Sequence, residues 1–390
     1  MFDFDEVIDR RGTHSSKWDT IEQGFGVSPD DGLAMWVADM DFRAPPAVNE
    51  ALHELAAHGV HGYYGDDASY TAAIAGWMKR RHDWHVEPEW IATAHGIVAG
   101  LAVCLQAFSQ PGEGVVLFTP VYHAFAKIIK ANGRRVHECP LKLEEGRFEM
   151  DLDALAASLT GQEKIVVFCS PHNPGGRIWS VEEQRALADF CAEHGLLLIS
   201  DEIHHDIVMP GRKHVVMPNA APEHVGNTVM LTGATKVFNI AGCLTGNVII
   251  ADPGLRERFH RAHMAVGTSV NRLGAVMVEA AYSKGDAWCD ALCAYIDENF
   301  RVFAEGVNAI PGLWAMPLDS TYLAWVDFNN TGMSQAEITE RVRKEAGIAA
   351  NDGPLFGTGG EGHMRFNIAT PRVRIEDAVA RLQRAFGDLQ

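Results

Sequence analysis

Short apolar runs alternate with amphipathic stretches between about residues 90 and 255. The apolar runs lie at residues 114–118, 164–169, 196–199 and 228–231. The stretches between them include residues 121–131 and 181–194, where hydrophobic positions recur at helical spacing. Apolar strands separated by helices are typical of a mostly parallel sheet that helices cover on both faces. The pattern therefore predicts an α/β domain.

The pattern changes beyond about residue 290. We expect a helix to about residue 309, a strand at 321–327 and helices at 334–346 and 375–386. This mixture favours a smaller α+β domain. The first forty-odd residues are irregular and rich in Asp and Gly, and we expect them to pack on that domain. The predicted division is an N-terminal segment (1–48), a large domain (49–288) and a small domain (289–390).

Composition narrows the classes of function. The 390 residues carry a formal net charge of −18 without clustered Lys and Arg, which disfavours a nucleic-acid partner. No signal peptide and no run of about twenty apolar residues are present, so we expect no membrane association. The seven cysteines lie mostly in apolar stretches without a C-x-x-C pair. They are typical of reduced packing residues in a cytoplasmic protein.

Lys236 is the first candidate for chemistry. It follows the apolar run 228–231 in Thr232-Gly-Ala-Thr-Lys236 and is surrounded by small residues. A buried ammonium is costly, so such a lysine is paired, has a depressed pKa or is used covalently, for example in an imine with an aldehyde cofactor. A lysine that reaches the surface from a strand end is an equal alternative on this segment alone.

Three further candidates follow other apolar runs. Asp201 follows the run 196–199, Asn173 lies in a Pro- and Gly-rich turn after 164–169, and Tyr122 follows 114–118. The carboxyl ends of parallel strands form the ligand edge of open α/β sheets, so these side chains are expected near one site. The alternatives are a helix cap for Asp201, a turn residue for Asn173 and a core tyrosine for Tyr122.

Two more segments indicate anion binding. The segment Thr93-Ala-His-Gly96-Ile97-Val98-Ala-Gly100 precedes a helical stretch, and its backbone N–H groups suit an anion at a helix N-terminus. Arg365 lies inside an otherwise apolar strand and needs an anionic partner, either a substrate carboxylate or a structural ion pair.

A metal centre is not expected. The pattern His204-His205-Asp206 contains an H-x-D, and His214 follows, which resembles an iron-binding facial triad. Such triads usually sit on β-barrels, whereas this segment alternates strand and helix, and no zinc-like Cys/His spacing occurs.

Taken together, these segments resemble fold type I enzymes that depend on pyridoxal 5'-phosphate (PLP), within the class I/II aminotransferase superfamily. Several motifs are similar to its cystathionine β-lyase or C-S lyase branch. They are Met35-Trp-Val-Ala-Asp-Met-Asp-Phe42, His61-Gly-Tyr63, Ser200-Asp-Glu-Ile-His-His-Asp206, Lys236-Val-Phe-Asn-Ile-Ala-Gly242 and Met364-Arg-Phe-Asn-Ile-Ala369. The resemblance implies a homodimer with an amino-acid substrate.

The resemblance also implies roles for individual residues. Lys236 would form the Schiff base and act as general base, and Asp201 would pair with the pyridine nitrogen. The other expected cofactor contacts are Asn173, Tyr122, His204, the backbone at Ile97 and Val98, a hydroxyl of Thr232 or Thr235, and Tyr63 of a neighbouring subunit. Lys236, Asp201 and Tyr63 would be catalytic, and Arg365 and Ala38 would bind substrate.

Two positions depart from the wider superfamily. Many relatives carry an arginine eight residues after the lysine, where this chain has Leu244. The residue three before the lysine, often serine, is Gly233. Phosphate binding would therefore depend on hydroxyls and backbone dipoles.

The activity implied is β-elimination from L-cysteine S-conjugates, with cystathionine as the favoured example, to give pyruvate, ammonia and a thiol. An aminotransferase shares the early steps and is the alternative. A regulatory protein that keeps a PLP domain is a third, although no DNA-binding segment is appended to the chain.

Overall fold

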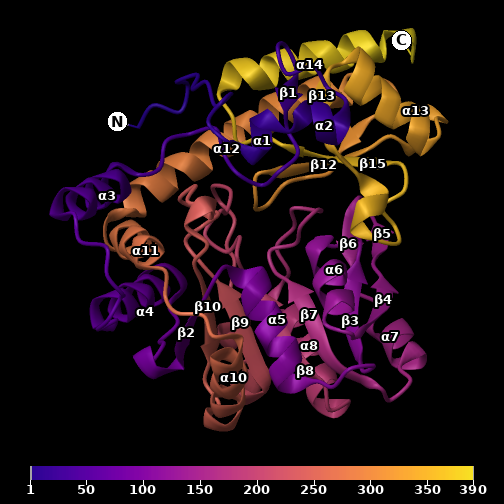
Figure 1. The fold of residues 1–390 in the computed structure, drawn as a ribbon. Helices are drawn as coiled ribbons and strands as arrows, with labels where there is room; N and C mark the ends of the chain where they lie inside the picture. The colour runs from indigo at the N-terminus through magenta and orange to yellow at the C-terminus, as the bar shows by residue number, and fades with distance from the viewer. Residues whose placement is uncertain (1, 390) are drawn as a thin grey trace.

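The structure is a computed structural model that describes residues 2–389, and a seven-stranded sheet dominates its larger part (Figure 1). The strand order is β2 (Ile91–Ala94), β10 (Gly246–Ile250), β9 (Thr228–Thr232), β8 (Leu197–Asp201), β7 (Glu163–Cys169), β3 (Gly114–Thr119) and β4 (Arg135–Pro140). Strand β10 runs antiparallel to β2 and β9, and the other four pairs in this sheet are parallel. The sheet confirms the predicted mostly parallel α/β fold.

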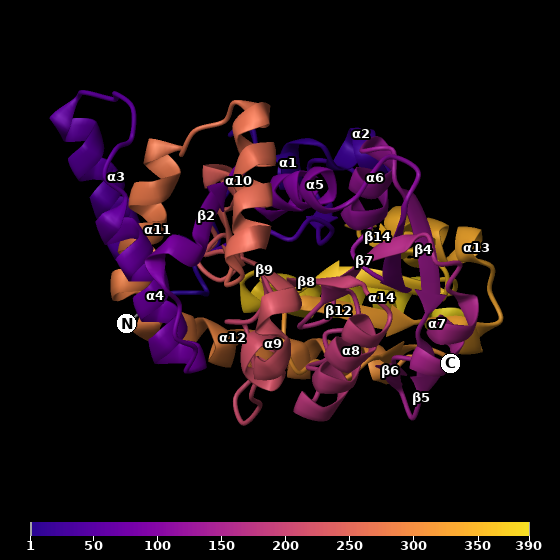
Figure 2. The same cartoon turned by 90° about the horizontal axis from the view of Figure 1, so that it is seen from below.

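Helices cover both faces of this sheet (Figure 2). One face carries α5 (Ile97–Phe108), α6 (Ala124–Ala131) and α10 (Pro253–Val266), and the other carries α8 (Val181–Glu193) and α9 (Met217–Ala220). At the β2 side, α11 (Arg272–Lys284) packs on both α3 (Pro46–His58) and α4 (Ala68–His82). The remaining elements of this part are α7 (Leu152–Ser158) and the hairpin of β5 (Lys142–Glu144) and β6 (Arg147–Glu149).

Local sequence explains these elements. Every residue of β3 is buried, so the strand is apolar throughout, without polar alternation. Helix α8 begins with a capping box between Ser180 and Glu183. The helix predicted at residues 121–131 begins only at Ala124, and ahead of it the N–H of Val121 donates to the carbonyl of Phe356.

A second, four-stranded antiparallel sheet lies above the first in Figure 1. Its order is β11 (Trp314–Ala315), β12 (Leu323–Asp327), β15 (His363–Asn367) and β14 (Asn351–Asp352). Helices α12 (Asp286–Asn308) and α14 (Arg372–Ala385) pack together beside it, and α13 (Gln335–Glu340) continues into a π-helical turn. The strand predicted at 321–327 begins at Leu323 because Thr321 has a φ of 74°.

The N-terminal segment forms α1 (Ser16–Asp19), α2 (Ile21–Phe25) and β1 (Leu33–Ala34), and β1 pairs in parallel with β13 (Ile348–Ala349). Met35 N donates to Ala349 O and its carbonyl accepts from Asn367 N, both at 2.8 Å. The segment is therefore hydrogen-bonded to the smaller sheet. The domain boundaries at residues 48 and 288 stay a prediction.

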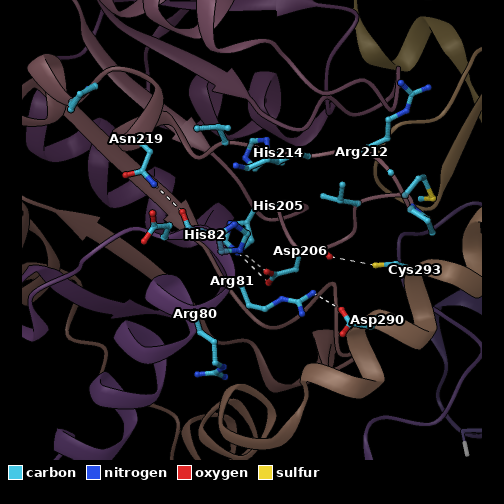
Figure 3. A pocket seen from close by; sticks show the side chains of 18 residues that line it. Arg80, Arg81, His82, His205, Asp206, Arg212, His214, Asn219, Asp290 and Cys293 are labelled. Carbon is cyan, nitrogen blue, oxygen red and sulfur yellow. Dashed lines mark hydrogen bonds and ion pairs between the residues drawn. The ribbon is translucent and has the colours of Figure 1, made fainter.

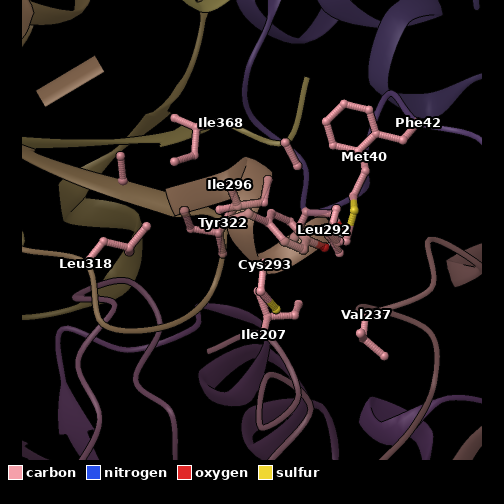
Figure 4. Packing of buried hydrophobic residues seen from close by; sticks show 14 of the residues in the cluster. Met40, Phe42, Ile207, Val237, Leu292, Cys293, Ile296, Leu318, Tyr322 and Ile368 are labelled. Carbon is pink, nitrogen blue, oxygen red and sulfur yellow. Dashed lines mark hydrogen bonds between the residues drawn. The ribbon is translucent and has the colours of Figure 1, made fainter. Parts of the chain in front are cut away.

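One hydrophobic cluster joins the two parts of the molecule (Figure 4). Its members come from the N-terminal segment, the helices α3, α4, α11, α12 and α14, the smaller sheet, the β2 side of the large sheet and the loops above it. They include Met40, Phe42, Ile207, Val237, Leu292, Ile296, Leu318, Tyr322 and Ile368. Within residues 2–389, no helix has both the length and the apolar character needed to cross a bilayer.

Candidate active site

The carboxyl ends of β3, β7, β8 and β9 lie near the N-terminus of α5, and residues at or just after these strand ends line a cavity of about 200 Å³ together with the start of α5. Strand register explains the convergence, because Cys169 pairs with Asp201, which in turn pairs with Leu231. The cavity brings together nine residues singled out from the sequence: Ala38, Ile97, Val98, Tyr122, Asn173, Asp201, His204, Thr235 and Lys236.

Lys236 is half-buried against the N-terminal segment. Its Nζ donates to the carbonyl of Ala38 at 2.7 Å, and the hydroxyl of Tyr322 donates to the same carbonyl at 3.0 Å. Burial lowers the pKa of Lys236 to about 8, although nearby Asp39 raises it. A larger share of this amine is therefore unprotonated near neutral pH than for an exposed lysine, as a nucleophile requires.

Asp201 ends β8 with its side chain fully enclosed. The N–H of Ile203 donates to Oδ1 at 3.1 Å, but burial dominates and raises the pKa of the carboxyl to about 7. The protein therefore supplies too little positive charge to keep this carboxylate ionised on its own. A protonated ring nitrogen would complete the environment.

Arg365 lies in the middle strand β15 and is 2% exposed. It donates to Asn173 Oδ1, Asn351 Oδ1 and the carbonyl of Trp36, each at 2.9 Å. All three acceptors are neutral, the Nε atom has no partner among the described residues, and burial lowers the pKa of Arg365 to about 10. A guanidinium with only neutral partners is suited to an incoming carboxylate.

The N-terminus of α5 forms another part of the wall. Gly96 precedes it with a φ of 84°, and no side chain caps the helix. A Cβ on Gly246 would lie 2.8 Å from the backbone nitrogen of Ile97, so only glycine lets β10 approach this turn. The N–H groups of Ile97 and Val98 are thus placed for an anion.

Two predicted residues lie elsewhere in the described chain. Thr232 is fully buried and its hydroxyl lies 3.1 Å from Nδ1 of His205, which leaves Thr235 as the hydroxyl in the cavity. Tyr63 is 98% exposed in the segment between α3 and α4, away from the cavity. Leu244 lines the cavity, so the position of the relatives' arginine is apolar.

Sequence patterns did not single out Tyr322 or Asn351. Tyr322 lies near the start of the predicted strand 321–327, where an aromatic side chain is typical of the hydrophobic core. Asn351 reaches Arg365 only because β14 pairs with β15. Their roles follow from contacts between distant segments.

A wider cavity of about 730 Å³ adjoins the first and shares Ala38, Lys236 and Ala241 with it. Two arginines line it. Arg10 is paired with Asp39 and Asp41 at 3.0 Å, and Arg43 is paired with Glu6.

Comparisons with known proteins agree with this arrangement. Residues 32–382 match the family described as aminotransferase class I and II. Cystathionine beta-lyase PatB of Bacillus subtilis is 38% identical over 98% of this chain and 99% of its own length. The structure of cystalysin from Treponema denticola, which contains PLP, superposes with a TM-score of 0.95 at 34% identity, covering 100% of both chains.

The PLP-bound C-S lyase from Staphylococcus hominis superposes with a TM-score of 0.91 at 31% identity, over 99% of this chain and 98% of that one. These likenesses span nearly the whole chain and include the cavity at the strand ends. The chain therefore belongs to the aminotransferase class I and II family, with the fold type I architecture of its PLP-dependent members.

Proposed function

We propose that this chain is a PLP-dependent carbon–sulfur lyase that converts L-cysteine S-conjugates, such as cystathionine, into pyruvate, ammonia and a thiol. The observation that carries the proposal is that a half-buried amine of lowered pKa and a buried carboxylate of raised pKa face one cavity. The names of the relatives agree, since PatB and the S. hominis protein are called lyases.

The donor set fits PLP. Lys236 supplies the amine for its aldehyde, Asp201 a negative charge for its ring nitrogen, and Ile97 and Val98 N–H groups for its phosphate. Bound PLP would supply an electron sink for the substrate Cα. Tyr122 would pack on the flat ring, and Asn173, with its Oδ1 occupied by Arg365, would offer its amide N–H groups.

The protein's own groups then account for binding and proton transfer. Arg365 would hold the substrate α-carboxylate, which orients the amino acid toward Lys236. The amine of Lys236, which the Ala38 carbonyl and the Tyr322 hydroxyl help to position, would be placed to remove the substrate Cα proton.

Ion pairing favours the lyase over an aminotransferase. A transaminase for dicarboxylic substrates needs a free cation for the second carboxylate. Both arginines that line the adjoining cavity are already paired, Arg10 with two aspartates and Arg43 with Glu6. The relatives named as lyases match this chain more closely than the aspartate aminotransferase of Pyrococcus horikoshii, which is 21% identical.

The test is incubation with cystathionine in the absence of a keto acid. A lyase releases pyruvate and thiol in equal amounts over many turnovers, whereas an aminotransferase stops after one turnover. Lys236→Ala should abolish pyruvate release and the visible absorbance of the bound cofactor. Continued pyruvate release by this variant would refute the proposed role of Lys236.

We also propose a homodimer in the cytoplasm. Tyr63 is 98% exposed, and Val60 and Leu273 nearby are 62% and 51% exposed, as expected of a surface that a second subunit covers. The seven cysteines are all buried and unpaired within the described residues, which suits a reducing compartment. Light scattering during size-exclusion chromatography would show a monomer if the dimer is wrong.

A further inference from the structure

Two histidines and an aspartate from separate segments meet outside the proposed active site. His82 is the last residue of α4, while His205 and Asp206 lie in the loop after β8. Nε2 of His82 lies 2.7 Å from Oδ1 of Asp206, and Nε2 of His205 lies 3.1 Å from Oδ2. Figure 3 shows both rings directed at the carboxylate, and one donor atom from each residue falls within 4.8 Å of the others.

Neighbouring side chains hold this cluster in place. The Thr232 hydroxyl lies 3.1 Å from Nδ1 of His205, and Trp77 Nε1 donates to Asp206 Oδ1 at 2.9 Å. Asn219 donates to the carbonyl of His82 at 2.9 Å. The Thr232 hydroxyl also lies 3.3 Å from Nε2 of His205, so it contacts the ring edge and restrains the ring orientation.

The cluster is enclosed yet reachable. The side chains of His82, His205 and Asp206 are 6%, 1% and 2% exposed. All three line a cavity of about 890 Å³ that shares no lining residue with the cavity around Lys236. This space gives an ion a path of entry and leaves room for water as a further ligand.

We propose that His82, His205 and Asp206 bind a divalent transition-metal ion of the Zn²⁺ class, with water from the cavity as the fourth ligand. Two imidazole nitrogens and one carboxylate are ligands that zinc accepts, at distances of about 2.0–2.2 Å. Tetrahedral coordination at such distances separates neighbouring ligand atoms by about 3.3 Å. The present separations are 2.7 Å from Nε2 of His82 to Oδ1 of Asp206 and 3.1 Å from Nε2 of His205 to Oδ2, so the first must widen by about 0.6 Å for an ion to enter.

The site differs from the H-x-D pattern in the sequence. His204 lines the cavity around Lys236, and His214 Nε2 is bonded to Glu202 at 2.8 Å, so neither joins Asp206. His82 takes their place from 124 residues away. An ion there would tie the end of α4 to the loop that follows Asp201, and thereby brace the strand end that carries the carboxylate.

Metal binding to the untagged holoenzyme tests the proposal. After treatment with a chelator, titration with Zn²⁺ should show one tight site per chain, and Co²⁺ should give visible d–d bands of a four-coordinate ion. His205→Asn should weaken Zn²⁺ binding at least tenfold, and His82→Asn should do the same. His224→Asn, which changes the other, exposed group of potential ligands formed with Asp189 and Glu223, should leave the site intact.

Unchanged cofactor absorbance and circular dichroism would show that each variant is folded. Absence of a saturable site in the wild-type protein would overturn the proposal, whatever the variants do. So would undiminished binding by folded His205→Asn and His82→Asn, or loss of the site in His224→Asn. Because pyruvate release is measured separately, failure here leaves the proposed lyase activity untouched.

Discussion

Replacing Asp201 with asparagine should stabilise the cofactor-free protein while it disables the enzyme. Asparagine has nearly the same shape and keeps an oxygen to accept the Ile203 N–H, but it carries no charge. The buried charge at Asp201 is costly until a protonated ring nitrogen faces it. The substitution therefore removes the free-energy cost of burying this charge, which is present only when no cofactor is bound.

The size of this cost follows from the pKa. Burial raises the pKa of Asp201 from 3.8 to about 7, so the folded state binds the proton more tightly than the unfolded state. The contribution of Asp201 to the free energy of unfolding is therefore most favourable below about pH 4 and falls as the pH rises from there to about 7. At roughly 1.4 kcal/mol for each pKa unit, about 4 kcal/mol is lost by pH 8.

Urea unfolding of the cofactor-free wild type and of Asp201→Asn between pH 4 and pH 8 measures this loss. The difference in unfolding free energy should move in favour of the variant as the pH rises, by about 4 kcal/mol across the range. Asp30→Asn, at an exposed aspartate, should follow the wild type throughout. With PLP and cystathionine, Asp201→Asn should release pyruvate far more slowly.

Parallel stability curves for wild type and Asp201→Asn would refute the reasoning. They would mean that the carboxylate is already compensated in the cofactor-free protein, and that its pairing with a ring nitrogen is not required.

Three further substitutions test other parts of the structure. Arg365→Lys should raise KM for cystathionine about 10–100-fold in pyruvate-release assays, because a charged hydrogen bond contributes about 1.5–3 kcal/mol; an unchanged KM would exclude Arg365 from carboxylate binding. Tyr63→Phe should weaken PLP binding about tenfold in equilibrium dialysis without changing monomer stability, while the control Tyr64→Phe should not, and equal effects would argue against a role across the dimer. Asp41→Asn should lower the free energy of urea unfolding by about 3–5 kcal/mol, because buried Lys17 loses the carboxylate 3.0 Å away; a loss below about 1 kcal/mol would contradict this.

Much of the fold followed from local pattern. Buried parallel strands are largely apolar, so β3, β7, β8 and β9 are visible as short runs, and the polar residues that follow a run mark the ligand edge. That rule located Asp201 and Lys236. Local pattern places the start of α6 three residues too early, in a segment where Val121 donates to the carbonyl of Phe356.

Residues that act through distant contacts escaped local pattern. Thr232 and Thr235 both precede the lysine, and sequence gave no means to tell which hydroxyl faces the cavity. In the structure the Thr232 hydroxyl contacts His205, so Thr235 is the hydroxyl that faces the cavity. The pairing of His82 with Asp206 likewise depends on how the C-terminal end of α4 meets the loop after β8, which no spacing in the chain encodes.

The attachment of the N-terminal segment to the smaller sheet has a mechanical consequence. Met35 is hydrogen-bonded to both Ala349 and Asn367, so the stretch that ends in Ala38 travels with the strand that carries Arg365. If that sheet tilted, the guanidinium of Arg365 and the carbonyl of Ala38 would move together. Entry and release of amino acids would then depend on a rotation of the smaller sheet, without a separate mobile loop.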